Sequence, residues 1–317
     1  MLKKIKILLL AGVISIGVVG CSSKGNEEVV EDKVKITLVL DEGGVNDQSF
    51  NQSAWEGALK AKEDLGVEVS YIEAKQESDY ATNIETAIDQ ESDLIIGVGF
   101  KLTDTIEQSA KAYPEQKFAI IDGTYDEIPS NVAPILFNEE QAGYSVGLIA
   151  ANMTETNVAG FIGGMEIPSV TNFLVGFEKA IKEENSDIKI LTQYANSFTD
   201  AAKGRSIGEQ MISNKADILF TAGGGINAGV FEVCKEKNIK AIGVDMPSNY
   251  IAPDVIITSA LKNVGTGVEL ITKDLVAGKF KGGEVKMFDL TNGGVGFEKT
   301  NLLSNELVKY VEDKLNK

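Results

Sequence analysis

The sequence contains no histidine, only two cysteines and a single tryptophan among its 317 residues. Without histidine, the chain lacks the commonest general base, the Ser-His and Cys-His pairs of many hydrolases, and the commonest zinc ligand. Carboxylates or lysine could still support catalysis. The most frequent catalytic arrangements, however, are excluded.

Positive charge is also scarce. Lysine and arginine number 30 against 47 aspartates and glutamates, which gives a formal charge of −17. Nucleic acids and anionic lipid headgroups attract clustered basic side chains. The composition therefore argues against nucleic acid as a partner, and against a membrane contact that relies on protein charge.

The long apolar run of the chain lies at its N-terminus. Three lysines precede Ile7–Gly20, a run shorter than the about 20 residues that a membrane-spanning helix needs. It ends in VVGC (18–21), which resembles the bacterial lipobox, where the signal is cut before an acylated cysteine. We expect residues 1–20 to be a lipoprotein signal peptide and Cys21 the lipidation site, followed by a solvated tether over 21–33. An ordinary secretory peptide is the alternative.

From Val34 onward, apolar strand-like runs alternate with helical patterns. Runs rich in valine, isoleucine and leucine are typical of strands that are covered on both faces. The expected strands are residues 35–40, 67–74, 93–99, 117–122, 132–137, 158–164, 188–195, 216–222, 239–245 and 255–261, and the helices between them include 53–65, 81–89, 139–154, 169–184, 201–213 and 227–237. This order predicts an α/β fold with parallel sheets.

Ten strands exceed one comfortable core, so we expect two Rossmann-like lobes with a cleft between them. A first crossing is expected at residues 153–157. The N-terminal lobe would comprise residues 34–155 plus about 262–282, and the C-terminal lobe 156–261 plus about 283–317. Asn292-Gly293-Gly294 between two apolar runs predicts a hairpin, after which a short helix closes the chain.

Two motifs invite enzymatic interpretations. GYSVG (143–147) matches the G-x-S-x-G elbow, but Ser145 lies within a helical pattern and has no histidine partner, which argues against a nucleophile.

GGGINA (223–228) follows a strand, and Asp245 lies twenty residues beyond Gly225, the spacing of a dinucleotide fold. An extracytoplasmic protein has no ready supply of a nicotinamide cofactor. A different ribose-bearing ligand would fit both features, and no cofactor is expected.

Polar residues and two phenylalanines follow the expected strands, and ligands of open parallel sheets bind beyond the carboxyl ends of strands. Phe50 and Phe198 stand at strand ends of different lobes, where they could sandwich a flat ligand. Carboxylates at the same edge suit sugar hydroxyls and exocyclic amines. Asp47 could instead cap a helix, and Phe173 could belong to the core.

Six segments together resemble the basic membrane protein family of lipoproteins: DEGGVNDQSFNQSAWEG (41–57), AIIDG (119–123), NSFTDAAKG (196–204), FTAGGGINAGVF (220–231), IGVD (242–245) and SALKNVG (259–265). Members of this family are similar to purine nucleoside receptor subunits of ABC transporters. The resemblance implies a type I periplasmic-binding-protein fold over essentially the whole mature chain.

The resemblance also implies roles for individual residues. Phe50 would stack on one face of a purine, and either Phe198 or Phe173 on the other. The base edge or sugar would contact Asp41, Asn51 and Asp122, and the ribose side would contact Gly224, Asp245 and Lys262. Asp47 is also expected among the ligand-binding residues. No metal site and no catalytic residue are expected.

The leading hypothesis is a nonenzymatic receptor that is lipid-anchored at the extracytoplasmic face of the cell membrane. It would capture a purine nucleoside between closing lobes and present it to an ABC permease with its ATPase. The alternatives are a nucleoside-processing or nicotinamide-dependent enzyme, a ligand-sensing regulator, and a nucleoside sensor or adhesin without a role in transport.

Overall fold

The computed structural model describes residues 33–316. The expected signal peptide, Cys21 and nearly all of the tether lie outside the described residues. Within 33–316, no helix combines the length and the apolar character needed to cross a membrane.

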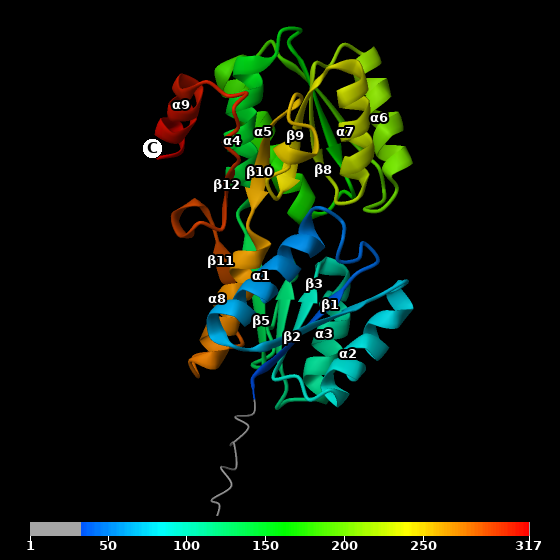
Figure 1. The fold of residues 1–317 in the computed structure, drawn as a ribbon, viewed down its shortest axis with the longest axis vertical. Helices are drawn as coiled ribbons and strands as arrows, with labels where there is room; N and C mark the ends of the chain where they lie inside the picture. The colour runs from blue at the N-terminus through cyan, green and yellow to red at the C-terminus, as the bar shows by residue number, and fades with distance from the viewer. Residues whose placement is uncertain (1–32, 317) are drawn as a thin grey trace, which may run out of the picture. The chain divides into compact units, whose positions relative to one another are not determined.

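The first of two sheets has the strand order β11-β5-β4-β3-β1-β2, and all its pairings are parallel. Its strands are β1 (Lys35–Leu40), β2 (Glu68–Glu73), β3 (Leu94–Val98), β4 (Lys117–Ile121), β5 (Val132–Phe137) and β11 (Lys286–Phe288). The helices around it are α1 (Phe50–Leu65), α2 (Tyr80–Asp89), α3 (Thr103–Ala112) and α8 (Val264–Val276), with short 3₁₀ turns at Glu77–Asp79 and Phe100–Leu102. We call this sheet with its helices the first lobe (Figure 1).

The second sheet has the equivalent order β12-β10-β9-β8-β6-β7, in which only β12 runs antiparallel to its neighbour. Its strands are β6 (Val158–Gly163), β7 (Lys189–Tyr194), β8 (Ile218–Ala222), β9 (Lys240–Asp245), β10 (Ile256–Lys262) and β12 (Val295–Phe297). The helices are α4 (Glu139–Met153), α5 (Pro168–Glu184), α6 (Ala201–Ser213), α7 (Ile226–Lys237) and α9 (Asn305–Leu315), and 3₁₀ turns lie at Asn249–Ile251 and Leu290–Asn292. Together they form the second lobe. The predicted ten strands are therefore confirmed, and two short strands join them.

Alternation along each strand explains why helices cover both faces of the sheets. In β1, Leu38 and Leu40 share a core cluster with α1 and α8, whereas Val39 points to the other face, where it joins α2 and α3. In β8, Phe220 packs with α4 and α5, whereas Leu219 packs with α6 and α7. Each lobe is thus a sheet between two layers of helices, as its continuous apolar strands predict.

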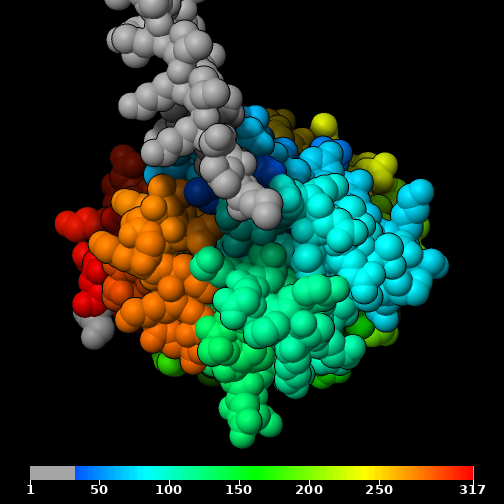
Figure 2. Space-filling view, turned by 90° about the horizontal axis from the view of Figure 1, so that it is seen from below, coloured from blue at the N-terminus to red at the C-terminus, as the bar shows by residue number. Residues whose placement is uncertain are grey.

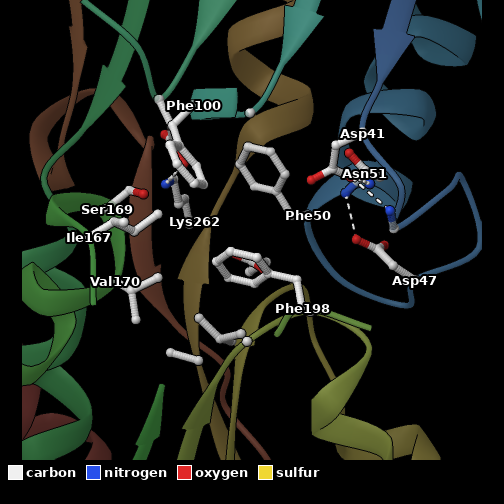
Figure 3. A pocket seen from close by; sticks show the side chains of 18 of the residues that line it. Asp41, Asp47, Phe50, Asn51, Phe100, Ile167, Ser169, Val170, Phe198 and Lys262 are labelled. Atoms are coloured by element: carbon white, nitrogen blue, oxygen red, sulfur yellow. Dashed lines mark hydrogen bonds and ion pairs between the residues drawn. The ribbon is translucent and has the colours of Figure 1, made fainter. Parts of the chain in front are cut away.

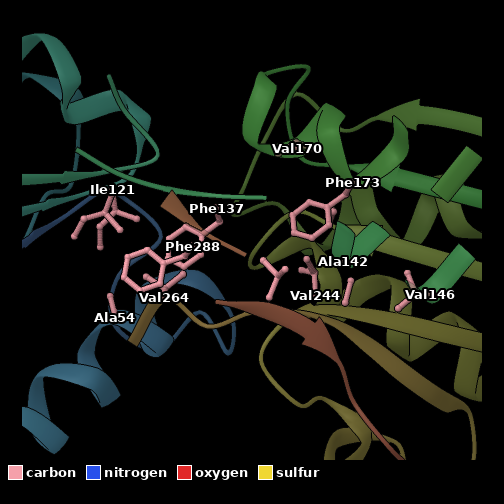
Figure 4. Packing of buried hydrophobic residues seen from close by; sticks show 14 of the residues in the cluster. Ala54, Ile121, Phe137, Ala142, Val146, Val170, Phe173, Val244, Val264 and Phe288 are labelled. Atoms are coloured by element: carbon pink, nitrogen blue, oxygen red, sulfur yellow. The ribbon is translucent and has the colours of Figure 1, made fainter. Parts of the chain in front are cut away.

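The cluster on the α1 and α8 side continues from one lobe into the other. Phe137 and Phe288 stack with their ring centroids 5.3 Å apart at the ends of β5 and β11. Ala142 and Val244 belong to the same cluster in the second lobe (Figure 4). The lobes therefore share apolar packing where the chain crosses between them.

The chain returns to the first lobe late in the sequence. The segment after α8 lies against the strand start at residues 130–132, where Gly283 N donates to Val132 O at 2.9 Å. Figure 2 shows these late residues, in orange, beside the green and cyan residues of the N-terminal part. The first lobe is thus built from two stretches that are far apart in the sequence.

The first crossing comes earlier than the sequence indicated. We expected residues up to 155 in the first lobe, but α4 packs against α5, β10, β12 and α9 and so belongs to the second. The crossing falls at Asn138, between β5 and α4. Helix α4 carries many buried residues and a long apolar face that either lobe could have accepted, so its partner is fixed only by tertiary packing.

The predicted hairpin around Asn292 is wrong. Strand β11 pairs with β5 in the first lobe, whereas β12 pairs with β10 in the second. We expected the chain to belong to the second lobe from about residue 283, but residues 286–288 belong to the first. Between them, the Asp289 carboxylate caps a 3₁₀ turn and Gly293 follows with φ +74°. The asparagine–glycine signal marks a real turn, but the turn carries the chain from one sheet to the other.

Glycines allow α4 and α5 to pack closely. A Cβ atom at Gly143 would lie 2.0 Å from the carbonyl oxygen of Phe173, and one at Gly147 would lie 2.7 Å from that of Phe177. Between these glycines, Ser145 is buried and donates to the carbonyl of Ala142 at 2.6 Å. The GYSVG motif is therefore a helix-packing device here.

Candidate functional site

One cavity of about 610 Å³, including its mouth, lies between the lobes. All ten ligand-binding candidates from the sequence line it: Asp41, Asp47, Phe50, Asn51, Asp122, Phe173, Phe198, Gly224, Asp245 and Lys262. Most stand at the carboxyl ends of strands or just beyond, where parallel strands of both sheets deliver their loops. The strand-end rule therefore accounts for most of the predicted set, whereas Phe173, which lies within α5, was expected from the family resemblance.

Asp122 and Asp245 occupy equivalent places in the two lobes. Asp122 directly follows β4 and Asp245 ends β9, the corresponding strand of the second sheet. Both residues have φ +63°, an uncommon conformation for a residue with a side chain. The strained backbone turns each carboxylate at the edge of its sheet, so that the two acids enter the cavity from opposite lobes.

The loop after β1 fixes a group of acceptors. Asn51 Nδ2 donates to Asp41 Oδ1 at 2.7 Å, and Gly43 N donates to the same oxygen at 2.9 Å. With its amide nitrogen committed to Asp41, Asn51 leaves Oδ1 buried and without a partner among residues 33–316. An orphaned acceptor is costly, so this position suits a ligand that brings a donor.

Asp47 acts mainly as a helix cap. Its carboxylate accepts the backbone N–H groups of Ser49 at 2.9 Å, Asn51 at 2.9 Å and Gln52 at 3.0 Å, at the start of α1. These are N–H groups that lack partners in any helix. The capping alternative considered for Asp47 is thus what its contacts show, although the side chain also lines the cavity. Asp200 likewise caps α6 by accepting from Lys203 N.

Aromatic rings meet in the middle of the cavity. Phe50 from the first lobe and Phe198 from the second both point into it (Figure 3). Phe100, which directly follows the loop after β3, has its ring centroid 6.4 Å from that of Phe198 in an edge-to-face arrangement. Phe173 is only 2% exposed and packs edge-to-face on Phe220 at 6.1 Å, so most of its ring belongs to the core.

Lys262 is the buried cation of the site, with 1% of its surface exposed. Its Nζ donates to Asp122 Oδ2 at 2.5 Å and to Glu139 Oε1 at 2.8 Å. It also lies 5.3 Å from the ring centroids of both Phe50 and Phe137. Paired and hydrogen-bonded in this way, a buried ammonium can be retained.

Burial shifts the protonation of these groups. Burial raises the pKa of Asp245 to about 7, against the opposing effects of Lys262 and the Ser49 hydroxyl. Burial also raises the pKa of Asp122 to about 6, where Lys262 opposes the rise and Glu139 adds to it. Burial alone would lower the pKa of Lys262, but the surrounding carboxylates outweigh it and the net shift is upward. Asp41 has a raised pKa for the same reason of burial.

The glycine loop before α7 is held by its own side chains. Asn227 Oδ1 accepts from Thr221 Oγ1 at 2.7 Å and from Gly223 N at 3.1 Å. Gly225 N donates to the carbonyl of Phe198 at 2.8 Å, and Gly224 has φ +59°. The loop therefore places Phe198 in the cavity, a role that the match to a dinucleotide fingerprint did not suggest.

The sequence interpretation missed several lining residues: Gly99, Phe100, Ile167, Ser169, Val170, Ala222 and Val244. Phe100 follows the end of β3 more closely than Phe50 follows the end of β1, so the same strand-end rule could have found it. Gly99 has φ +106°, and a side chain there would approach the Phe50 ring. Glu139 starts a helix, and nothing in its local pattern signals the contact with Lys262.

Comparison with known proteins identifies the family. The family described as "ABC transporter substrate-binding protein PnrA-like" matches residues 33–317. The chain belongs to this family. The resemblance read from the six segments is thereby confirmed, and this family places the protein among the extracytoplasmic substrate-binding proteins of ABC transporters.

Individual relatives cover nearly the whole chain. Basic membrane protein A of Borreliella burgdorferi is 37% identical, over 98% of this chain and 93% of the relative. The ABC transporter nucleoside-binding protein BmpA of Lactococcus lactis subsp. cremoris is 36% identical, over 90% of this chain and 88% of the relative. The crystal structure of an ABC transporter solute-binding protein from Aeropyrum pernix superposes with a TM-score of 0.79 at 30% identity, over 89% of this chain and 80% of the other. The solved structure of this solute-binding protein therefore shares the two-lobe α/β fold predicted for the chain.

Proposed function

We propose that the protein is a nonenzymatic receptor that captures purine nucleosides outside the cytoplasm and delivers them to an ABC permease and its ATPase. The observation that carries this proposal is the pair Phe50 and Phe198, which point into one cavity from different lobes (Figure 3). Two rings can stack on both faces of a flat base only when the lobes close on it, and each stack adds about 0.5–1.5 kcal/mol beyond burial.

The polar groups around the rings match a nucleoside. Asp41, Asn51 and Asp122 offer acceptor oxygens, two of which lack a partner among the described residues, and a base with N–H donors or a ribose with hydroxyl groups would satisfy them. Asp245, Lys262 and the glycine loop at Gly224 meet the same space from the other side, where the ribose would lie. The Lactococcus relative whose name states nucleoside binding supports the same ligand class.

We further propose that acylated Cys21 anchors the receptor to the cell membrane. The lysines, the apolar run and the VVGC ending supply each part of a lipoprotein signal. A single substitution, Cys21→Ala, should release the protein from membranes into the extracellular or periplasmic fraction. Metabolic labelling with a fatty acid should mark the wild type alone, and label on the Cys21→Ala protein would refute the anchor.

Calorimetric titration tests the ligand. The signal-free protein, residues 22–317, is suitable because residues 33–317 form one compact unit that contains the whole site. We expect heat from adenosine, guanosine or inosine, weaker or no heat from cytidine and ribose, and recovery of intact nucleoside by chromatography afterwards. Cytidine and ribose are the matched controls, because they test the purine ring and the base separately. An absence of purine nucleoside binding would refute the ligand class, and conversion of nucleoside to free base would favour an enzyme.

A further inference from the structure

Glu139 is a buried acid that stands behind the cavity wall. It is the first residue of α4, and only 3% of its surface is exposed. Its Oε1 accepts from Lys262 Nζ at 2.8 Å, and its Oε2 accepts from Asn172 Nδ2 on α5 at 3.3 Å. The carboxylate is thus held from two sides, by the last residue of β10 and by a helix of the second lobe.

The hydrogen bonds of Lys262 leave one N–H group without an acceptor among residues 33–316. An ammonium has three N–H donors. Asp122 and Glu139 take two of them. The faces of Phe50 and Phe137 lie on further sides, each with its ring centroid 5.3 Å from Nζ. Since Lys262 lines the cavity, its third donor remains for a ligand there.

Glu139 and Asp122 pull the ammonium from different lobes. Asp122 follows β4 of the first lobe, whereas Glu139 begins α4 of the second. If Asp122 were its only partner, the Lys262 ammonium could move together with the Asp122 carboxylate, because the lysine side chain is flexible. Hydrogen bonds to both Asp122 and Glu139 hold the ammonium at one position between the two carboxylates.

We infer that Glu139 is a positioning residue, which shares the Lys262 ammonium with Asp122 and so directs its third N–H group at the bound ligand. This inference rests on the proposed function, because an acceptor of the nucleoside, such as a ribose oxygen or a ring nitrogen, would receive that donor. Glu139 itself does not line the cavity. The competing explanation is that Glu139 only neutralises a buried lysine.

The substitution Glu139→Gln tests the inference. The amide keeps the shape and an acceptor oxygen but removes the charge, and Lys262 keeps Asp122 as its ion-pair partner. We expect the affinity of the signal-free protein for inosine and for adenosine to fall by about tenfold, the size of a hydrogen bond to a charged group. Glu140→Gln is the matched control, since Glu140 is the next residue of α4, is exposed and approaches Lys179 only at 3.9 Å. Its affinity should equal that of the wild type.

The pH dependence tests whether the charge of Glu139 acts on Asp122 in the binding site. Asp122 faces Lys262, Glu139, Asp245 and the hydroxyl of Ser169, and the charge of Glu139 helps to raise its pKa to about 6. Affinity should fall on acidification as Asp122 loses its acceptor character. In Glu139→Gln, the pKa of Asp122 is lower, so this fall should occur at a lower pH. Unchanged affinity, or a loss by the same factor at every pH between 5 and 8, would overturn the inference.

A second, milder substitution tests the inference even if the Glu139→Gln protein fails to fold. Asn172→Ala changes an exposed helix position and removes only the hydrogen bond to Glu139 Oε2. We expect its melting temperature to be close to that of the wild type and its affinity to fall by about threefold. An unchanged affinity in a folded Asn172→Ala protein would count against the inference. If the wild type binds no purine nucleoside, the proposed function fails instead, so the two failures are distinguishable.

Discussion

The Ser49 hydroxyl donates a hydrogen bond to the Asp245 carboxylate, and this bond joins the two lobes beside the cavity. Ser49 lies just before α1 in the first lobe, and Asp245 ends β9 in the second. Both side chains are buried. A buried carboxylate needs a donor, so the bond stabilises the closed arrangement of the lobes.

Replacement of Ser49 by alanine should favour an open arrangement. The Asp245 carboxylate would lose its donor when the lobes close, which costs about 1–3 kcal/mol. We expect a larger radius of gyration for the ligand-free protein in small-angle X-ray scattering, and an affinity for purine nucleoside weaker by at least about fivefold.

Ser145→Ala is the matched control for this change. Ser145 is also buried, but its hydroxyl donates within its own helix to Ala142 O. Its loss should leave both the radius of gyration and the affinity unchanged. If Ser49→Ala behaves like Ser145→Ala, the bond to Asp245 does not influence closure.

Asp245 should make the protein less stable as the pH rises. Its pKa is about 7 in the folded protein and near the ordinary aspartate value in the unfolded chain. Between these two pH values, the folded protein binds a proton on Asp245 that the unfolded chain does not bind. The free energy of unfolding should therefore fall as the pH rises from about 4 to about 7, by about 2–4 kcal/mol from this group. Asp245→Asn should remove this part of the pH dependence, measured by urea unfolding at pH 4, 5, 6, 7 and 8. Parallel curves for the two proteins would contradict the shift.

Alanine substitutions should show which cavity phenylalanines bind the ligand and which stabilise the core. Phe50→Ala and Phe198→Ala should each weaken purine nucleoside binding by about tenfold or more while the fold is kept, because each loses a stacking face and buried area. Phe173→Ala should instead lower the free energy of unfolding by about 3–5 kcal/mol, since this ring packs on Phe220.

Calorimetry and thermal melts on the same samples distinguish the two classes. Tyr113→Ala is a suitable control, because this aromatic residue follows α3 and is 41% exposed away from the cavity lining. Wild-type affinity in Phe198→Ala, combined with a severe loss in a stable Phe173→Ala protein, would assign the second stacking face to Phe173.

Close packing of α4 and α5 should make Gly143 intolerant of a side chain. A Cβ there would lie 2.0 Å from the Phe173 carbonyl oxygen, so Gly143→Ala must push the helices apart. We expect a loss of about 2–4 kcal/mol in the free energy of unfolding. Gly296→Ala on β12 is the control, because nothing lies within 4 Å of its added Cβ. Equal stability of the two variants would show that α4 can shift without cost.

Much of this architecture could be predicted because each strand carries its own signal. Val/Ile/Leu runs located ten strands, and the strand-end rule located most of the expected cavity residues, since both depend on local sequence and on a general property of parallel sheets. Phe173, which lies within α5, was expected from the family resemblance instead. Phe100, just beyond the end of β3, obeys the same rule.

Other features depend on contacts that local sequence does not encode. Helix α4 could pack against either sheet, and its tertiary packing against α5, β10, β12 and α9 places it in the second lobe. Asn292-Gly293 predicts a turn but not which strands the turn connects. Glu139 gained its importance from Lys262, 123 residues away in the sequence, through a contact that exists only in the folded chain.

The three crossings between the lobes are tied to one another. Asn138 N donates to Phe288 O and Asn263 N to Gly294 O, each at 2.8 Å, and the side chain of Asn263 also donates to Gly293 O at 2.7 Å. Three independent linkers would allow the lobes to twist and slide in many ways. Because the three linkers are hydrogen-bonded side by side, bending about them should be easier than sliding along them. The lobes should therefore open and close by a hinge rotation about a single axis.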